Sequence, residues 1–154
     1  HYNHIKVASY AKTLRDACVR VLIGAHGQRE GLAAHWEMWM LNQGGFTPWE
    51  ALRSGSYDPA IALGMDTDLG SIEVGKLADI VITDGDVLND IRRSELISHT
   101  MINGRLYDVS DMSEMVSGKS TVEPLFFDRL EINAMPAATA KSVAQKAKRH
   151  HWVH

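Results

Sequence analysis

Cysteine is nearly absent from this sequence, because Cys18 is the one cysteine among 154 residues. A single thiol cannot form a disulfide within the chain, so we expect no disulfide framework to support the fold. Cys18 lies in the apolar run 17–23. We therefore expect a buried, small hydrophobic side chain at this position rather than a nucleophile.

Long apolar runs and basic patches are also missing. No stretch approaches the ~18 to 20 consecutive apolar residues that a membrane helix requires, so we expect no membrane partner. The formal charge is −3 at pH 7, and Lys and Arg are scattered among Asp and Glu. Without a basic stripe to neutralise phosphates, nucleic acid is not an expected partner either. No signal peptide is recognisable, but the chain starts with His rather than Met, so localisation stays open, with the cytoplasm preferred.

What the sequence does contain is typical of a globular domain, with 45% hydrophobic and 23% charged residues. Apolar residues at helical spacing predict helices over 7–17 and 31–42. Between them, the β-rich run 19–23 predicts a short buried strand. The glycine-flanked turn 24–27 follows this strand and can aim a side chain at a site.

A capping box gives the clearest local signal. Thr47 is the expected N-cap, Pro48 stands at the first helical position, and Glu50 follows Thr47 by three residues. Asp58-Pro59 predicts the start of another short helix, which ends near Gly64.

After Gly70 the pattern changes to short strands. We expect strands at 79–83 and 97–102, and the second of these ends at Asn103-Gly104 before the run 105–107. Two β-runs separated by Asn-Gly predict a hairpin. Beyond about residue 108 the periodicity fades.

Three runs, 45–53, 58–64 and 69–82, resemble the C-terminal third of the metal-dependent amidohydrolase superfamily, which includes imidazolonepropionases, dipeptide-cleaving enzymes and dihydroorotase-like enzymes. The similarity extends over roughly residues 19–107. It implies an α/β fold that comprises the C-terminal part of a (β/α)₈ metallo-hydrolase barrel together with strands of a small β-sandwich. Such a barrel alone takes ~250 residues, so we expect the missing part to lie upstream of this chain.

This resemblance divides the chain into three parts. Residues 1–68 are expected to hold the last strand and helices of the barrel, and residues 69–108 the strands that return to the β-sandwich. Residues 109–154 are expected to form an irregular or helical C-terminal tail.

His26 is the candidate catalytic residue and metal ligand, because the resemblance places it at the C-terminal end of the strand 19–23, where barrel enzymes carry catalytic groups. Most of the superfamily has an aspartate there, which binds metal and takes a proton from the attacking water. A neutral imidazole can also bind Zn²⁺ or act as a base, but it cannot supply the charge of a carboxylate. A metal-binding role, a substrate-positioning role and an ordinary loop histidine therefore all stay open for His26.

Gln28, Glu30 and His35 are the candidate substrate-binding residues. Glu30 precedes the helix 31–42 and has the alternative role of favouring the positive end of the helix dipole. His35 shares a helix face with Trp39, and packing is the alternative role for that face.

The resulting hypothesis is a C-terminal fragment of a metal-dependent amidohydrolase that hydrolyses C–N bonds, in an amide or cyclic amide, of a small molecule. The divalent metal, with Zn²⁺ favoured, is expected in the full-length enzyme. Because most of the superfamily's ligands are not in this sequence, we expect the chain to be inactive alone. It would require the missing N-terminal barrel portion as a partner, or would self-associate through its open edges. The alternative is a non-catalytic interaction or scaffold module derived from that fold.

Overall fold

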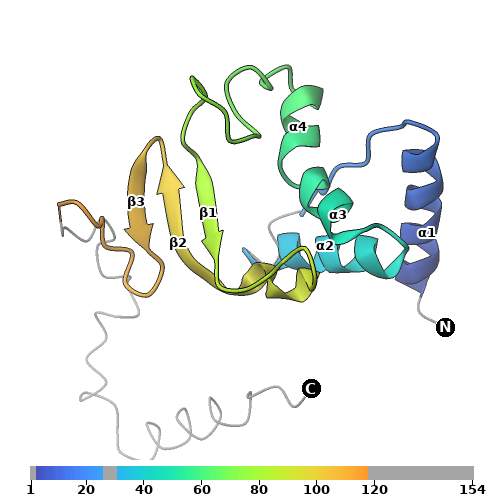
Figure 1. The fold of residues 1–154 in the computed structure, drawn as a ribbon. Helices are drawn as coiled ribbons and strands as arrows, with labels where there is room; N and C mark the ends of the chain where they lie inside the picture. Colours follow the sequence, from blue (N-terminus) through green and yellow to red (C-terminus); the bar gives the residue numbers. More distant parts are fainter. Residues whose placement is uncertain (1–2, 26–30, 118–154) are drawn as a thin grey trace, which may run out of the picture. The chain divides into compact units, whose positions relative to one another are not determined.

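The computed structural model of the chain describes residues 3–25 and 31–117 (Figure 1). Contacts between residues gather His1–Lys119 into one compact unit, and the second unit, Ser120–His154, lies outside the described residues. The elements of the first unit are α1 (Asn3–Asp16), α2 (Leu32–Gln43), α3 (Pro48–Ser54), α4 (Tyr57–Ala62), β1 (Ile80–Thr83), the 3₁₀ helix η1 (Ile91–Glu95), β2 (Ile97–Ile102) and β3 (Arg105–Asp108).

Helix α2 is the centre of the helical region, which we define as α1 to α4. It packs against α1, α3 and η1, while α3 also packs against α4. The buried core residues are Met38, Phe46, Ala51 and Ile91. Val21 and Ile23 pack against this core from the segment between α1 and α2. Burial of these side chains is the main contribution that holds the helices together.

Helices α1 and α2 approach each other very closely at the end of α2. Gly44 caps α2, and a Cβ atom placed on it would lie 2.3 Å from the Cβ atom of Ala8 in α1. Ala8 is itself buried. The pair of small residues therefore allows the two helices to come together where larger residues could not.

The capping box predicted for α3 is confirmed. The Thr47 hydroxyl accepts a hydrogen bond from the backbone N–H of Glu50 at 3.2 Å, and the Glu50 carboxylate accepts from the N–H of Thr47 at 2.8 Å. Pro48 occupies the first turn, where its missing N–H costs nothing. The helices predicted over 31–42 and from Asp58 are confirmed as α2 and α4, within one residue at their starts.

The strands form one antiparallel sheet in the order β1-β2-β3. The predicted hairpin is confirmed, since Ile102 pairs with Arg105 across Asn103 and Gly104. These two residues have φ angles of 48° and 79°, which is the conformation that a two-residue type I′ turn requires. The small antiparallel sheet and the helical region together make the described part of the chain a mixed α/β structure.

The predicted strand at 19–23 is wrong, because the structure assigns no strand between Val19 and Ala25. The run is β-rich, but a strand exists only when a neighbouring strand accepts its hydrogen bonds. Instead, the backbone N–H of Ile23 donates to the carbonyl oxygen of Ser54 at the end of α3, at 3.1 Å. The segment 19–25 therefore follows α1 as an irregular segment that no strand accompanies within the described part of the chain.

The predicted burial of Cys18 is also wrong, because the residue is exposed. Helix α1 begins at Asn3 and ends at Asp16, earlier at both ends than the predicted range 7–17. Cys18 then adopts a φ of 64°, and its N–H donates to Arg15 while the N–H of Val19 donates to Leu14. This is the Schellman arrangement that ends a helix, and it turns the Cys18 side chain away from the core.

None of the helices among the described residues is both long and apolar enough to cross a bilayer. The expectation that residues 109–154 form a tail falls mostly outside the described ranges. Within 109–117, the structure contains turns and one bridge that pairs Glu114 with Tyr107.

Candidate functional site

Three of the four candidate site residues, His26, Gln28 and Glu30, lie outside the described residues. The structure describes the chain up to Ala25 and again from Gly31. The roles assigned to these three residues therefore stay predictions, and the site can be built only from the elements that lead into it.

The segment 19–25 leads toward His26 in the sequence, and its residues from Arg20 to Ile23 alternate between exposed and partly buried. Val21 and Ile23 pack toward the core, whereas Leu22 between them is 41% exposed. This alternation is typical of an extended chain with two different faces. The exposed Leu22 side chain shows that the described residues leave apolar surface uncovered on the outer face.

Two hydrogen bonds fix the end of this segment. The Ile23 N–H donates to Ser54, as described above, and the next N–H, from Gly24, donates to the Glu37 carboxylate of α2 at 2.6 Å. A hydrogen bond to a charged acceptor is about twice as strong as one between neutral groups. Glu37 is a residue that sequence reasoning missed, because nothing in its spacing marks a glutamate within a helix as the hydrogen-bond acceptor of a distant backbone amide.

An apolar groove of about 330 Å³ runs between α1 and α2 beside this segment. Leu22 and Ile23 of the segment line this groove, together with Glu37 of α2. The remaining lining residues are His4, Val7, Ala8, Ala11, Met40 and Leu41. The groove and the uncovered face of the segment together form an open apolar surface.

His35, the fourth candidate, contacts η1 rather than the groove. Its Nδ1 atom lies 3.0 Å from the Ser94 hydroxyl, which also accepts a hydrogen bond from the Trp39 indole at 3.1 Å. Burial lowers the pKa of His35 below its ordinary value, although the negative charge of Glu95 opposes this effect. Packing of the face shared by His35 and Trp39 is therefore observed, and substrate binding by His35 stays a prediction.

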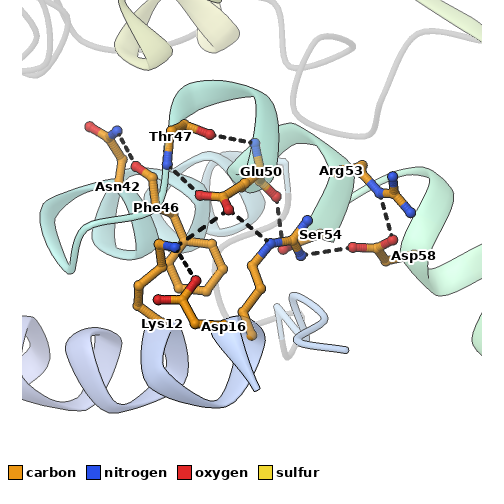
Figure 2. A network of polar contacts seen from close by, with 10 residues as sticks. Lys12, Asp16, Asn42, Phe46, Thr47, Glu50, Arg53, Ser54 and Asp58 are labelled. Carbon is orange, nitrogen blue, oxygen red and sulfur yellow. Dashed lines mark hydrogen bonds and ion pairs between the residues drawn. The ribbon is translucent and has the colours of Figure 1, made fainter. Parts of the chain in front are cut away.

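A second, strongly polar cleft of about 270 Å³ lies where α1 meets α3 and α4. One of its lining residues is Asp58, whose side chain is 3% exposed and pairs with Arg15 at 2.9 Å and with Arg53 at 2.8 Å (Figure 2). Burial raises the pKa of Asp58, but the hydrogen bonds and the attraction of the two guanidinium groups outweigh it and hold the pKa below its ordinary value. The negatively charged Asp58 in this cleft is therefore neutralised by two positively charged neighbours.

Glu50 extends this cluster toward α1. Its carboxylate lies 3.5 Å from both Lys12 and Arg15, and Lys12 also contacts Asp16 (Figure 2). Sequence reasoning assigned Asp58 and Glu50 only to the starts of helices, so the cluster was missed. The sequence does show basic residues near the end of α1, Lys12 and Arg15. Their spacing alone does not reveal which carboxylates they pair with.

None of these groups forms a metal centre by itself. Among residues 3–25 and 31–117, no group of three or more His, Cys, Asp or Glu side chains is placed to hold a metal ion. Asp58 and Glu50 already serve as partners of arginine and lysine. The described residues therefore do not supply the ligand set that the resemblance implies.

Comparison with known proteins identifies the relatives of the chain. Residues 5–107 match the model of the amidohydrolase family. The imidazolonepropionase of Symbiobacterium thermophilum is 53% identical over 38 residues, which are 25% of this chain and 9% of that protein. A solved Xaa-Pro dipeptidase superposes with a TM-score of 0.61 at 26% identity, over 66% of this chain and 25% of the dipeptidase.

A molinate hydrolase is similar as well, with a TM-score of 0.53 and 32% identity over 65% of this chain and 21% of that enzyme. In each of these comparisons the chain spans a quarter or less of its relative's length. The structure thus aligns to one part of a larger α/β fold. Since the family match extends over 103 of the 154 residues, from 5 to 107, this chain belongs to the amidohydrolase family.

Proposed function

We propose that this chain is the C-terminal part of a metal-dependent hydrolase that cleaves C–N bonds, in an amide or cyclic amide, of a small molecule. The observation that carries the proposal is the family match over residues 5–107 in a chain that spans about a quarter of the solved relatives. The finer fold belongs to the same proposal. The helical region and the segment 19–25 form the end of a (β/α)₈ barrel, and β1 to β3 are strands of its β-sandwich.

The open segment 19–25 supports the barrel assignment. Its sequence is β-rich, its residues from Arg20 to Ile23 alternate between exposed and partly buried, and no strand lies beside it among the described residues. In a closed barrel such a segment is paired on both sides. The N-terminal barrel portion is therefore the proposed partner, and self-association is the expected substitute when that portion is missing.

His26 is the proposed catalytic residue and metal ligand, and Gln28, Glu30 and His35 are the proposed substrate-binding residues. His26 follows the segment 19–25 directly, at the end where barrel enzymes carry their catalytic groups. An imidazole at that place can hold or accept a proton near neutral pH. This chemistry suits the activation of water for attack on a carbonyl carbon.

A divalent metal, with Zn²⁺ favoured, is part of the proposal because members of this family generally use metals. The described residues do not fit a metal site on their own, as shown above. The ligands must then come from the undescribed residues together with the partner portion. For this reason we expect the chain to be inactive alone.

The test compares this chain with the full-length product of its gene by intact mass, elemental analysis and hydrolysis of N-acyl amino acids, dipeptides and cyclic ureides. A product of barrel size, ~250 residues or more, that carries zinc and hydrolyses one of these classes is the expected result. His26→Ala should abolish hydrolysis, whereas the control His99→Ala, in β2, should retain it. A gene product limited to these residues, without metal or activity, would replace the proposal with a non-catalytic interaction module.

A further inference from the structure

Three polar side chains form one hydrogen-bonded group where α2 packs against η1, and we call His35, Trp39 and Ser94 the α2–η1 junction. The indole N–H of Trp39 donates to the carbonyl oxygen of Ile91 at 3.0 Å and to the Ser94 hydroxyl at 3.1 Å. The Nδ1 atom of His35 lies 3.0 Å from the same hydroxyl. Ser94 is 3% exposed, and Ile91 belongs to the buried core. The junction therefore joins the two elements at a place that is largely closed to water.

The chemistry of these groups decides which atom donates each hydrogen. An indole N–H can only donate, so the Ser94 oxygen accepts from Trp39. The Ser94 hydroxyl has one hydrogen of its own, and within residues 3–25 and 31–117 no acceptor other than Nδ1 of His35 contacts it. The contacts therefore assign the hydroxyl hydrogen to a bond with Nδ1, and the hydrogen of the neutral imidazole to Nε2.

Protonation of His35 reverses the role of Nδ1. A charged imidazole carries hydrogens on both nitrogen atoms, so Nδ1 becomes a donor that faces the Ser94 hydroxyl. The Ser94 oxygen can turn to accept from it, but the hydroxyl hydrogen then loses its acceptor at a buried site. A buried donor without an acceptor is costly. The closed arrangement of the junction consequently fits the neutral ring and not the charged one.

The charged groups around the junction do not remove this preference. Burial lowers the pKa of His35 below its ordinary value of 6.5, and the negative charge of Glu95 opposes this effect only in part. Arg92 brings a positive charge to the Trp39 ring, because its guanidinium carbon lies 5.5 Å from the ring centre. Further charged side chains on elements packed against α2 form ion pairs with one another, namely Arg93 with Asp90 beside η1, and Lys12 and Arg15 with Glu50 between α1 and α3.

We propose that the α2–η1 junction is a pH-sensitive switch, which is closed while His35 is neutral and opens when His35 takes up a proton. Because η1 lies between β1 and β2 in the chain, opening releases η1 from α2 and loosens the link between the helical region and the sheet. The ring binds a proton more readily in the open state. The closed state is therefore fully stable above the ordinary pKa of 6.5, and its stability is lost as the pH falls toward the lower pKa of the closed state.

The test is an NMR titration of the isotope-labelled full chain from about pH 8 to about pH 5. At the upper end, the imidazole nitrogen shifts of His35 should show a hydrogen on Nε2 and none on Nδ1. As the pH falls, His35 should titrate below 6.5, and the Trp39 indole proton should shift with the same midpoint. The backbone amides of Arg93 and Leu96 donate to carbonyl oxygens in and beside η1. Their protection from exchange should fall by up to about tenfold for each pH unit between the two pKa values.

Two variants separate this switch from an ordinary buried histidine. His35→Gln offers Ser94 an acceptor that does not titrate, so the shift of Trp39 and the loss of protection in acid should both disappear. The matched control His99→Gln, in β2, should retain both. Ser94→Ala removes the hydroxyl that donates to the neutral ring, so the pKa of His35 should rise toward 6.5.

Each other outcome counts against the switch. A hydrogen on Nδ1 of the neutral ring, or a His35 midpoint at or above 6.5, would contradict the assigned hydrogen bond. An equal loss of protection in His35→Gln and the wild-type chain would show that another group causes it. If His35→Gln does not fold, Ser94→Ala decides, because an unchanged His35 midpoint would exclude the Ser94 hydroxyl as its partner. The inference is independent of the proposed function, whose failure would be seen in metal content and hydrolysis.

Discussion

The helical region and the three-stranded sheet differ in how far their side chains are buried within the described residues. The helical region has a buried core and a buried charged cluster that join α1 to α3 and α4. In the sheet, no residue of β1, β2 or β3 is buried, and Val81 and Ile102 are exposed. The difference shows that the helices stabilise one another, whereas the sheet has apolar surface that this part of the chain does not cover.

The largest effect should come from removing the centre of the charged cluster. Asp58→Ala leaves Arg15 and Arg53 without their shared carboxylate, and we expect the free energy of unfolding to fall by about 3 kcal/mol. Urea denaturation followed by circular dichroism measures this loss. Asp16→Ala, which removes an exposed carboxylate, should cost about 0.5 kcal/mol or less. Equal losses in both variants would mean that the cluster does not hold the helices.

Acid should weaken the same cluster. Burial raises the pKa of Glu50, but the hydrogen bonds from Thr47 and the charge of Lys12 outweigh it, so its pKa lies below the ordinary value, as does that of Asp58. A carboxylate whose pKa is lower in the folded state stabilises the fold above its unfolded pKa. That contribution is lost as the pH falls through the folded pKa.

We therefore expect the free energy of unfolding to decrease as the pH falls below about 4.5, the ordinary value for glutamate. Asp58→Asn should show a shallower decrease over the same range, because it has lost one of the cluster's carboxylates with a lowered pKa. Urea denaturation at a series of pH values makes the comparison. Identical slopes for the wild-type chain and Asp58→Asn would contradict the assignment.

The close approach of α1 and α2 is the next target. In Gly44→Ala the new Cβ atom would lie 2.4 Å from the backbone carbonyl carbon of Ala8, so the helices must separate. We expect a loss of about 1 to 3 kcal/mol by urea denaturation. Gly24→Ala is the matched control, since its Cβ atom meets nothing and its φ is not positive. Replacing glycine by alanine also lowers the entropy of the unfolded chain, so Gly24→Ala should be neutral or slightly stabilising. A loss of similar size in Gly24→Ala would contradict crowding at Ala8 as the cause.

A substitution in the hairpin turn should destabilise the sheet and leave the stability of the helices unchanged. Asn103 has a φ of 48° at the hairpin turn, and Asn103→Ala places a residue without a local polar side chain in that conformation, at a cost of about 1 kcal/mol. Hydrogen exchange should accelerate in β2 and β3 but not in α2. Asn103→Asp keeps the tolerance for positive φ and should change exchange little. Faster exchange throughout the unit would show that the two regions unfold together.

Local signals in the sequence predicted much of this structure. The capping box at Thr47 and the hairpin turn at Asn103-Gly104 each depend on residues within four positions of each other. A short stretch of sequence therefore shows every residue that takes part in them. The strand expected at 19–23 depends on neighbours that the described residues do not include, and propensity alone could not reveal this. The anchor from Glu37 to Gly24 and the pairs around Asp58 join distant residues, and no spacing rule predicts them.

Helix α1 ends one residue earlier than predicted, and for Cys18 this is the difference between the predicted burial and the observed exposure. A substitution at Cys18 should also give the smallest change in stability among those considered. Its φ of 64° is the conformation that glycine prefers after a helix, so Cys18→Gly should relieve backbone strain of about 1 kcal/mol. Glycine also loses more chain entropy on folding, which offsets part of this gain. We therefore expect a net stabilisation of about 0.5 kcal/mol by urea denaturation. Cys18→Ala keeps the strained φ and should give no gain, so equal stability of the two variants would exclude strain at Cys18 as the cause.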